Sequence, residues 1–274
     1  MTGVLRRVNF TIALIALGIC SGCASDLPNR ITDEVRYPGK APVTFDLVLV
    51  PGDADTGIEP FYMATHEVTW DMFYDWAFGT GLDQADYHEY QKQGLRPSPL
   101  YETSRQLKLG FGKRPALGMT RKTAEMFADW ISERTGRRYR IPTDSQWQHA
   151  LKLGGGVPDD QESLLRQGVF IDNAEIMSDP PFLERTEEVG SKEPNALGIY
   201  DMLGNAAEWV VADDEKRCWV RGGHFMLQAH SFHADWKPVE DISVWSEKYP
   251  QLPVTKYWYR DHYYQGIRLI ADVQ

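Results

Sequence analysis

Two runs decide the fold of this chain: Gly204-Asn205-Ala206-Ala207-Glu208-Trp209 and Val220-Arg221-Gly222-Gly223-His224-Phe225-Met226-Leu227. Together they form one of five blocks that follow one another along the sequence. The other four are Phe61–Thr69, Trp130–Thr143, Pro194–Met202 and Tyr264–Leu269. Any one block is a weak signal, but five in this order and spacing are a specific one. The pattern occupies residues 43–274, without an internal repeat or a low-complexity tract.

The first 22 residues are expected to be a lipoprotein signal peptide. Arg6 and Arg7 form a basic start, and an apolar run of about a dozen residues follows, which is the length of a signal-peptide core. A membrane-spanning helix needs roughly 20 apolar residues. The run ends in Cys20-Ser21-Gly22-Cys23, which resembles a bacterial lipobox. We therefore expect lipidation at Cys23, with simple cleavage near the same point as the alternative.

Residues 23–42 are polar and contain three prolines, which suits a lipidated tether between a membrane and a folded domain. The folded domain is then expected to span residues 43–274. The expected location is extracytoplasmic, with the lipid on Cys23 holding the chain at the outer membrane or the periplasmic face of a bacterial membrane. The membrane itself is therefore the first expected partner.

Charge and cysteine content exclude several classes of protein. The formal net charge is −10, which argues against nucleic acid as a partner because such binding relies on clustered Lys and Arg. Cys20 leaves with the signal peptide and Cys23 is alkylated, so Cys218 remains as the single thiol. No intrachain disulfide is then available. We interpret Cys218 as a small buried hydrophobe rather than a redox centre.

Local signals predict several elements inside the domain. Alternation between Phe45 and Val50 predicts a strand. Thr69, Thr120 and Thr143 each precede apolar positions at helical spacing and are predicted helix N-caps. The last begins a Thr-x-x-Gln capping box. We assign no element to the insertion 82–114 or to the loop Val157–Glu188.

The five blocks resemble the sulfatase-modifying, formylglycine-generating enzyme family. The resemblance implies an α+β fold related to C-type lectins, with much irregular loop structure. In that family two cysteines after the Arg-Gly-Gly bind copper and oxidise a substrate cysteine. The corresponding positions here are Leu227 and Phe232, and His224 takes a serine position. Because neither Leu227 nor Phe232 can bind copper, no copper and no formylglycine-generating activity are expected.

The same resemblance implies calcium. The family's ligands map onto Asp201, Gly204, Ala206 and Glu208, which together offer two carboxylates and two backbone carbonyls. Ca²⁺ prefers six to eight hard oxygen ligands, which agrees with such a loop. The alternative is a metal-free loop whose Glu208 accepts backbone hydrogen bonds. A second family calcium site has its candidate ligands at three further positions, Asn173, Ala174 and Asp179.

The degenerate centre also contains histidines. His224, His230 and His233 lie close together, with Asp235 and Asp261-His262 further on. Two imidazoles and a carboxylate are a ligand set for iron, zinc or copper. The alternative is polar lining without metal. Arg221 is expected to order the local backbone or to pair with an acid, because a buried guanidinium requires partners.

The leading functional hypothesis is a calcium-stabilised, membrane-tethered binding or structural module whose ligand is an unidentified protein, peptide or glycan. The first alternative is a cysteine-independent periplasmic oxidoreductase of the siderophore-precursor type, a class that the resemblance includes. A formylglycine-generating sulfatase-maturation enzyme with an unusual mechanism is the second. The sequence therefore favours a protein that is not a formylglycine-generating oxidase.

Overall fold

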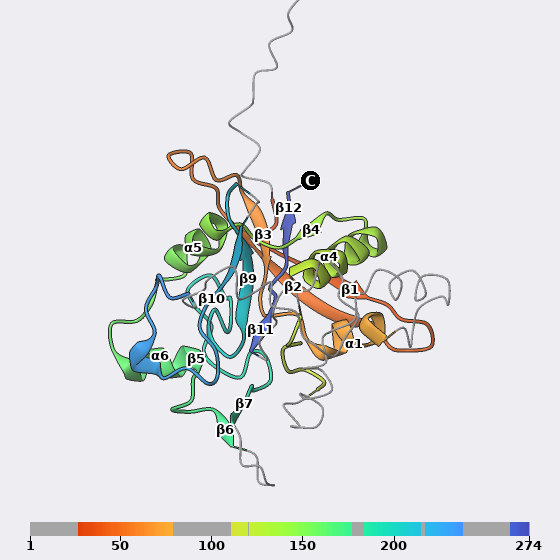
Figure 1. Cartoon of the computed structure of the whole chain (residues 1–274). Helices are drawn as coiled ribbons and strands as arrows, with labels where there is room; N and C mark the ends of the chain where they lie inside the picture. Colours follow the sequence, from red (N-terminus) through yellow and green to blue (C-terminus); the bar gives the residue numbers. More distant parts are fainter. Residues whose placement is uncertain are drawn as a thin grey trace, which may run out of the picture.

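The computed structural model describes residues 27–78, 111–119, 121–176, 184–214, 217–237 and 264–273. In Figure 1 the strands run through the middle of the molecule, with α1 and α4 to the right and α5 and α6 to the left. Several short strands and long irregular connections complete the picture. The α+β class with much irregular backbone is confirmed. The signal peptide, Cys23 and most of the insertion 82–114 lie outside the described residues.

The main sheet has five strands in the order β1-β2-β3-β12-β4. These strands are β1 (Arg30–Val35), β2 (Val43–Val50), β3 (Phe61–Ala64), β12 (Ile270–Asp272) and β4 (Tyr139–Arg140). Every pairing in this sheet is antiparallel. The last strand of the chain therefore lies inside the sheet, between strands from its first and middle parts.

Strand β1 corrects the expected domain boundary. Residues 23–42 were expected to be a tether, but Arg30–Val35 pairs with β2 over six residues, from Arg30 opposite Val48 to Val35 opposite Val43. Val35 and Tyr37 are buried, and Tyr37 donates a hydrogen bond to the Met72 carbonyl at 2.6 Å. The polar residues of this segment form the exposed face of an edge strand. The prolines on either side of that strand led to the incorrect prediction of a tether.

The two sequence runs that identified the fold, residues 204–209 and 220–227, contribute strands to smaller sheets. The three-stranded sheet has the order β10-β9-β11, from β10 (Cys218–Arg221), β9 (Ala207–Val211) and β11 (Gln265–Gly266). Two-stranded pairs join β5 (Gly168–Val169) to β8 (Leu203–Gly204) and β6 (Glu175–Ile176) to β7 (Glu184–Arg185). A 3₁₀ turn, Ala229–Ser231, follows the Gly-Gly pair.

The helix caps agree with the sequence. Helix α1 (Trp70–Phe78) follows Thr69, whose Oγ1 accepts a hydrogen bond from the Met72 amide at 3.4 Å. Helix α4 (Arg121–Thr135) is followed by Gly136 at φ 74°. Helix α5 (Asp144–Leu153) begins with the expected capping box and ends at Gly154. Thr120 lies outside the described residues.

One helix was missed. The segment assigned as a loop contains α6 (Gln161–Gln167), which Asp160 caps by accepting from the Ser163 amide at 2.8 Å. Its apolar face consists of little more than Leu164, so the helical period is weak over seven residues.

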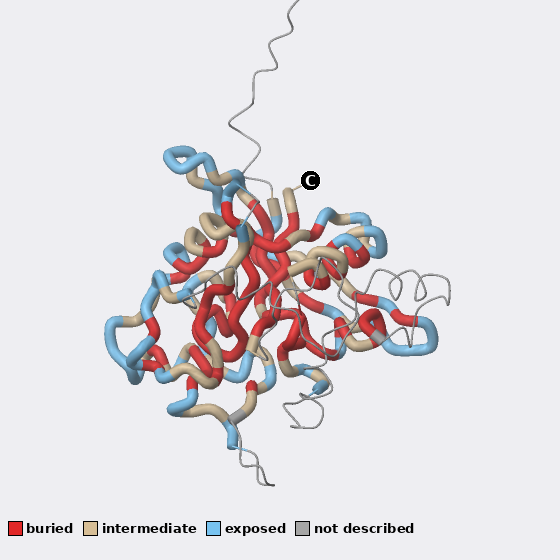
Figure 2. Tube along the Cα trace, viewed as in Figure 1, coloured by how far each residue is buried: buried red, intermediate tan, exposed pale blue. Residues whose placement is uncertain are grey.

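Two large clusters and one small cluster of buried side chains make the core of the described residues, and buried residues are red in Figure 2. In the first, Phe73, Trp76, Phe127 and Trp130 have ring centroids between 5.2 and 5.8 Å apart, which suits edge-to-face and offset contacts. The second surrounds Trp147 and Phe170. Among the described residues, no helix has the length and apolar character to cross a membrane.

Candidate functional site

Leu227 and Phe232, which the family resemblance aligns with the two cysteines, lie side by side in the structure. A Cβ added to Gly223 would lie 2.9 Å from Phe232 Cδ2 and 3.2 Å from Leu227 Cδ2, so both side chains pack on this glycine. Gly223 has φ 75°, a conformation that glycine adopts without strain. Phe232 is only 8% exposed and also meets Phe170 at 5.4 Å between ring centroids. The centre is therefore closed by apolar packing.

His224 lies in a group of aromatic side chains beside Leu227 and Phe232. Its ring stacks on Tyr264 at 3.9 Å and 8°, and meets Trp236 edge-on at 5.6 Å. Nδ1 accepts a hydrogen bond from the Met226 amide at 3.3 Å, which requires a lone pair on that nitrogen. The His224 ring is thus held both by aromatic neighbours and by its own loop.

The remaining histidines do not join His224. His230 and His233 are exposed, and within the described parts of the chain no three His, Cys, Asp or Glu side chains converge on a possible metal position. Asp261 and His262 lie outside those parts. The two-His-one-carboxylate hypothesis thus gains no support from the described geometry.

The predicted calcium ligand Glu208 is already fully engaged. Its Oε1 accepts from Arg268 Nη2 at 2.6 Å and Nε at 2.9 Å, and its Oε2 accepts from Trp147 Nε1 at 2.7 Å. Both Glu208 and Arg268 are completely buried. Burial alone would lower the pKa of Arg268, but the Glu208 carboxylate outweighs it and raises the pKa. The positive charge that pairs with the Glu208 carboxylate is therefore the guanidinium of Arg268.

Asp201 lies near this pair with a different environment. Its Oδ2 accepts from the Gly190 amide at 2.7 Å, while its buried Oδ1 has no hydrogen-bond partner among the described residues. Burial raises the pKa of Asp201 to about 6. Burial and the nearby Asp201 carboxyl also raise the pKa of Glu67 well above its usual value. Two of the three buried carboxyls in this cluster therefore bind a proton more tightly than an exposed carboxyl does.

These observations do not fit a calcium ion held by Asp201, Gly204, Ala206 and Glu208. Ca²⁺ requires charged or carbonyl oxygens turned towards it, yet Glu208 has its oxygens turned to Arg268 and Trp147. A divalent ion would also have to lie near the buried guanidinium. The loop is thus built around an internal ion pair.

The second set of candidate ligands has a structural role where it is described. Asn173 Oδ1 accepts from the Phe170 amide at 2.8 Å, and Nδ2 donates to the Leu165 and Gly168 carbonyls at 2.9 and 3.0 Å. Its side chain therefore closes the turn after β5. Ala174 packs beside the small cluster of Val169 and Phe225, and Asp179 lies outside the described residues.

Arg221 has the acidic partner that the sequence required. Its Nε and Nη2 donate to Asp144 Oδ1 and Oδ2 at 2.6 and 2.8 Å, and Trp219 Nε1 donates to Oδ1 at 2.9 Å. Burial would raise the pKa of Asp144, but these hydrogen bonds outweigh it and lower the pKa. The pair joins β10 to the start of α5. Cys218, at the far end of β10, has a half-buried side chain.

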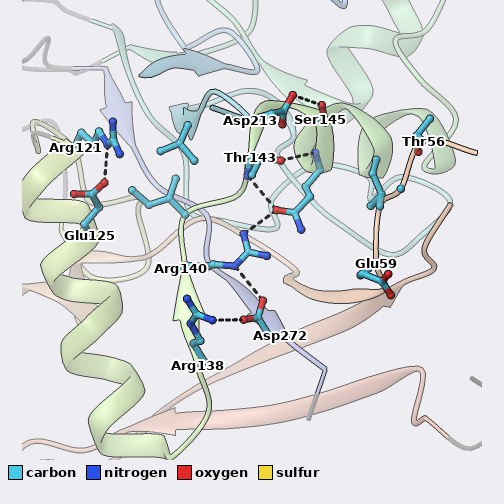
Figure 3. Close-up of a pocket in the computed structure, with 15 residues that line it drawn as sticks. Thr56, Glu59, Arg121, Glu125, Arg138, Arg140, Thr143, Ser145, Asp213 and Asp272 are labelled. Carbon is cyan, nitrogen blue, oxygen red and sulfur yellow. Dashed lines mark hydrogen bonds and ion pairs between the residues drawn. The ribbon is translucent and has the colours of Figure 1, made fainter. Parts of the chain in front are cut away.

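A polar cleft of about 740 Å³ lies at that far end of β9 and β10. Figure 3 shows its walls: Arg121 and Glu125 from α4, Arg138 and Arg140 around β4, and Asp272 from β12. The other side is formed by the 56–59 loop, the start of α5 and Asp213. Sequence reasoning missed this site, although the basic run Arg137-Arg138-Tyr139-Arg140 was a signal.

Hydrogen bonds hold the cleft walls in place. Arg140 Nε donates to Asp272 Oδ1 at 3.0 Å, and Arg140 Nη1 donates to Gln146 Oε1 at 2.8 Å. The same Gln146 oxygen accepts from the Thr143 amide at 3.1 Å in the capping box. The side chain of Arg140 is thus fixed by a sheet strand and a helix start. Ser145 Oγ donates to Asp213 Oδ2 at 2.6 Å on the opposite side (Figure 3).

Comparison with known proteins gives a consistent picture of family and fold. Residues 39–246 match the model of the sulfatase-modifying factor enzyme 1-like domain. Over 156 residues, the chain is 31% identical to the serine/threonine-protein kinase pkn1 of Chlamydia pneumoniae, covering 56% of this chain and 22% of that protein. With the protein of the same name from Chlamydia caviae it shares 27% identity over 189 residues, covering 68% and 27%. The chain thus spans about a quarter of these relatives.

Solved structures agree on the fold. PvdO from Pseudomonas aeruginosa aligns with a TM-score of 0.52 at 18% identity, over 89% of this chain and 92% of that one. Treponema denticola variable protein 1 aligns with a TM-score of 0.55 at 16% identity, over 89% and 99%. CarF aligns with a TM-score of 0.51 at 16% identity, over 90% and 98%. At these identities the likeness is one of fold.

Proposed function

The chain belongs to the sulfatase-modifying factor enzyme 1-like family, and on this premise we propose that it is a membrane-tethered binding module that does not generate formylglycine. The observation that carries the proposal is the packing of Leu227 and Phe232 on Gly223. Copper(I) prefers soft thiolate ligands, and the two positions that would provide them are filled by hydrocarbon. The half-buried Cys218 thiol is on a preceding strand and is a single sulfur.

The polar cleft is the proposed binding site. Charged groups from several elements converge on it, and its volume of about 740 Å³ is in the range of ligand clefts. It lies beside Val211 and Asp213, at the end of β9 remote from Glu208 and from the glycines that follow Arg221. Ligand binding there would not require the degenerate centre.

The tether and the location remain part of the proposal. The sequence of the first 23 residues supports a lipid on Cys23, and the proposed module would then face away from the cytoplasm. Several acyl chains hold a protein at a membrane more firmly than a single chain does. Calcium is left out of the proposal, because Glu208 is turned to Arg268 and Trp147.

A cysteine-independent oxidoreductase is the second candidate. The observation that favours it is the half-buried His224, stacked on Tyr264 and next to Trp236, at the family's reactive position. In this second proposal the His224 ring binds and orients a substrate. The fold neighbours PvdO and CarF are consistent with this second candidate.

The test is mass spectrometry of a sulfatase-type cysteine peptide after aerobic incubation with the pure protein and copper. The expected result is an unchanged thiol. The double variant Leu227→Cys, Phe232→Cys is the matched comparison, and the buried position of Phe232 predicts that it loses packing as well as gaining sulfur. Stoichiometric aldehyde in the wild-type reaction, and none without protein, would overturn the proposal.

A further inference from the structure

Strand β1 has one edge that no other described strand covers. It is the first strand of the five-stranded sheet, and β2 lies along its other edge (Figure 1). The Leu49 amide donates to the Asn29 carbonyl at 2.9 Å, which extends the β1–β2 register by one pair. Because backbone groups alternate in direction along an antiparallel pair, the odd-numbered residues of β1 face β2. The N–H and C=O groups of Arg30, Thr32 and Glu34 therefore face the open edge.

We propose that this edge is a dimer interface, at which β1 pairs antiparallel with β1 of a second copy of the chain. In the proposed pair, Thr32 lies opposite the partner's Thr32 on a two-fold axis, and Arg30 lies opposite the partner's Glu34. The main sheets of the two copies then join into one continuous sheet. The inference concerns a different surface from the polar cleft, so it does not depend on the proposed function.

The open edge has unused hydrogen-bonding groups. Across the described residues, and outside the pairing with β2, no backbone hydrogen bond joins Arg30, Thr32 or Glu34 to a neighbour. Proline and bulges commonly protect edge strands from pairing. The strand Arg30–Val35 contains no proline and pairs with β2 over all six residues without a bulge. Its edge is therefore a regular template for another strand.

The charges of β1 favour a second copy of β1 in one register. Even-numbered residues must lie opposite one another, because only their backbone groups face the open edge. A pair centred on Thr32 sets each Arg30 opposite the partner's Glu34. A pair centred on Arg30 or on Glu34 sets like charges directly opposite, which is destabilising. A pair centred on Ile31 or Asp33 sets Thr32 opposite a charge and matches no opposite charges. The strand is therefore complementary to itself about Thr32.

The charged side chains of β1 are accessible to a second copy. Those of Arg30 and Glu34 are 53% and 36% exposed. Each has an opposite charge within its own copy, with Asp46 at 3.0 Å from Arg30 and Arg36 beside Glu34. In the dimer, each Arg30 would lie between its own Asp46 and the partner's Glu34, so that the signs of the charges alternate. Such a network contributes more than isolated surface pairs do.

The proposed interface is weak, because a short strand pair buries little surface and exposed charges are screened by salt. The proposed lipid on Cys23 would offset this weakness. Arg30 follows Cys23 by seven positions, so two tethered copies would hold their β1 strands close to one membrane surface. Tethering of this kind raises the effective concentration of the second copy. In dilute solution the dimer is expected to need trapping.

Disulfide trapping of the full chain in detergent tests the pairing. Opposite residues in a hydrogen-bonded antiparallel pair have Cα atoms about 5.5 Å apart, within the disulfide range of about 4.4–6.8 Å. Thr32→Cys should therefore give a covalent dimer under mild oxidation, which a reductant separates. Thr44→Cys is the matched control, since Thr44 is exposed and lies opposite Glu34 on β2, one strand away from the open edge. The wild type controls for the native cysteines.

A dimer band no stronger in Thr32→Cys than in Thr44→Cys would overturn the inference. It would mean that the edge accepts a strand of another protein or no strand.

Charge exchange in the Thr32→Cys background tests the register. Arg30→Glu sets like charges opposite one another twice, so the rate of dimer trapping should fall about tenfold. Adding Glu34→Arg should restore the rate, because the facing charges are opposite again. Arg166→Glu, the same change at an exposed arginine of α6, should leave the rate unaffected, and thermal melting checks that each variant folds. Equal rates with and without Arg30→Glu, or no recovery in the exchanged variant, would contradict the proposed pairing.

Discussion

Arg268 and Glu208 form an ion pair that water does not reach: Nη2 lies 2.6 Å from Oε1, and both side chains are 0% exposed. The guanidinium also donates to the Ala64 and Tyr200 carbonyls at 3.0 and 2.8 Å. One side chain thereby joins β3, the loop before β8, and β9. Removing either partner would leave the other charge buried and unpaired.

Arg268→Ala is therefore expected to lower the free energy of unfolding by about 3–5 kcal/mol, the range for breaking a buried pair by removing one partner. Denaturant unfolding followed by tryptophan fluorescence measures the change. Arg166→Ala is the matched control, since its ion pairs are exposed and surface substitutions cost about 0.5 kcal/mol or less. Similar losses in the two variants would show that the pair is not closed to solvent.

Calcium is expected to leave thermal stability unchanged. A ligand that binds only the folded state adds about 2.7 kcal/mol at a hundredfold excess over Kd, and a site built around Arg268 provides no such binding. Melting temperatures in millimolar calcium and in chelator should agree. An upward shift with calcium in the wild type, absent in Glu208→Gln, would restore Glu208 as a metal ligand.

Asp201→Asn is expected to stabilise the protein at neutral pH. The folded pKa of Asp201 is about 6 against an ordinary value of 3.8, so the folded state binds the proton more tightly. The wild-type carboxyl therefore costs no stability below the unfolded pKa, and the cost grows as pH rises through both pKa values. An amide keeps an acceptor for Gly190 and avoids the buried charge, and Asn tolerates the φ of 55° at this position.

The expected gain for Asp201→Asn is about 1–3 kcal/mol at pH 7, the free-energy equivalent of a pKa raised from 3.8 to about 6, and it should shrink towards pH 4. Chemical denaturation at the two pH values measures it. Asp159→Asn, an exposed acid in the loop before α6, is the control and should show neither effect. A loss of stability at pH 7 would mean that the Asp201 anion has a favourable partner.

Cys23→Ser is expected to move the protein from the membrane fraction to the soluble fraction without loss of fold. The reason is that lipid on Cys23 is the proposed attachment of the chain to the membrane. Fractionation and immunoblotting provide the measurement. An uncleaved signal peptide could itself retain the variant, so a version beginning at Ala24 is compared. Retention of that shorter version would contradict the lipid tether.

The structural predictions that rest on short local sequence signals were the most accurate. The capping box from Thr143 to Gln146 and the cap at Thr69 are contained in a few residues, so their physics can be read without the rest of the chain. Strand β1 could not be predicted in this way. Its pairing with β2 depends on a neighbour that the period of its own residues does not reveal.

The site was less predictable, because its determining contacts join distant segments. Glu208 and Arg268 are 60 residues apart, and the spacing of Asp201 and Glu208 gave no indication that a guanidinium would lie beside them. The polar cleft combines residues from Thr56 to Asp272. The sequence predicted that Arg221 would pair with an acidic residue, because a buried guanidinium requires one. It did not predict that this residue is Asp144.

The position of β12 has a consequence for export. Ile270 pairs with Met63 on one side and with Arg140 on the other, so the main sheet has a gap until this segment has been synthesised. A chain with that gap lacks the backbone partners that would join β3 to β4. If a signal peptide directs the chain through a narrow translocation channel, the late synthesis of β12 keeps the chain incompletely folded during passage. Folding is then completed after translocation, when β12 pairs with β3 and β4.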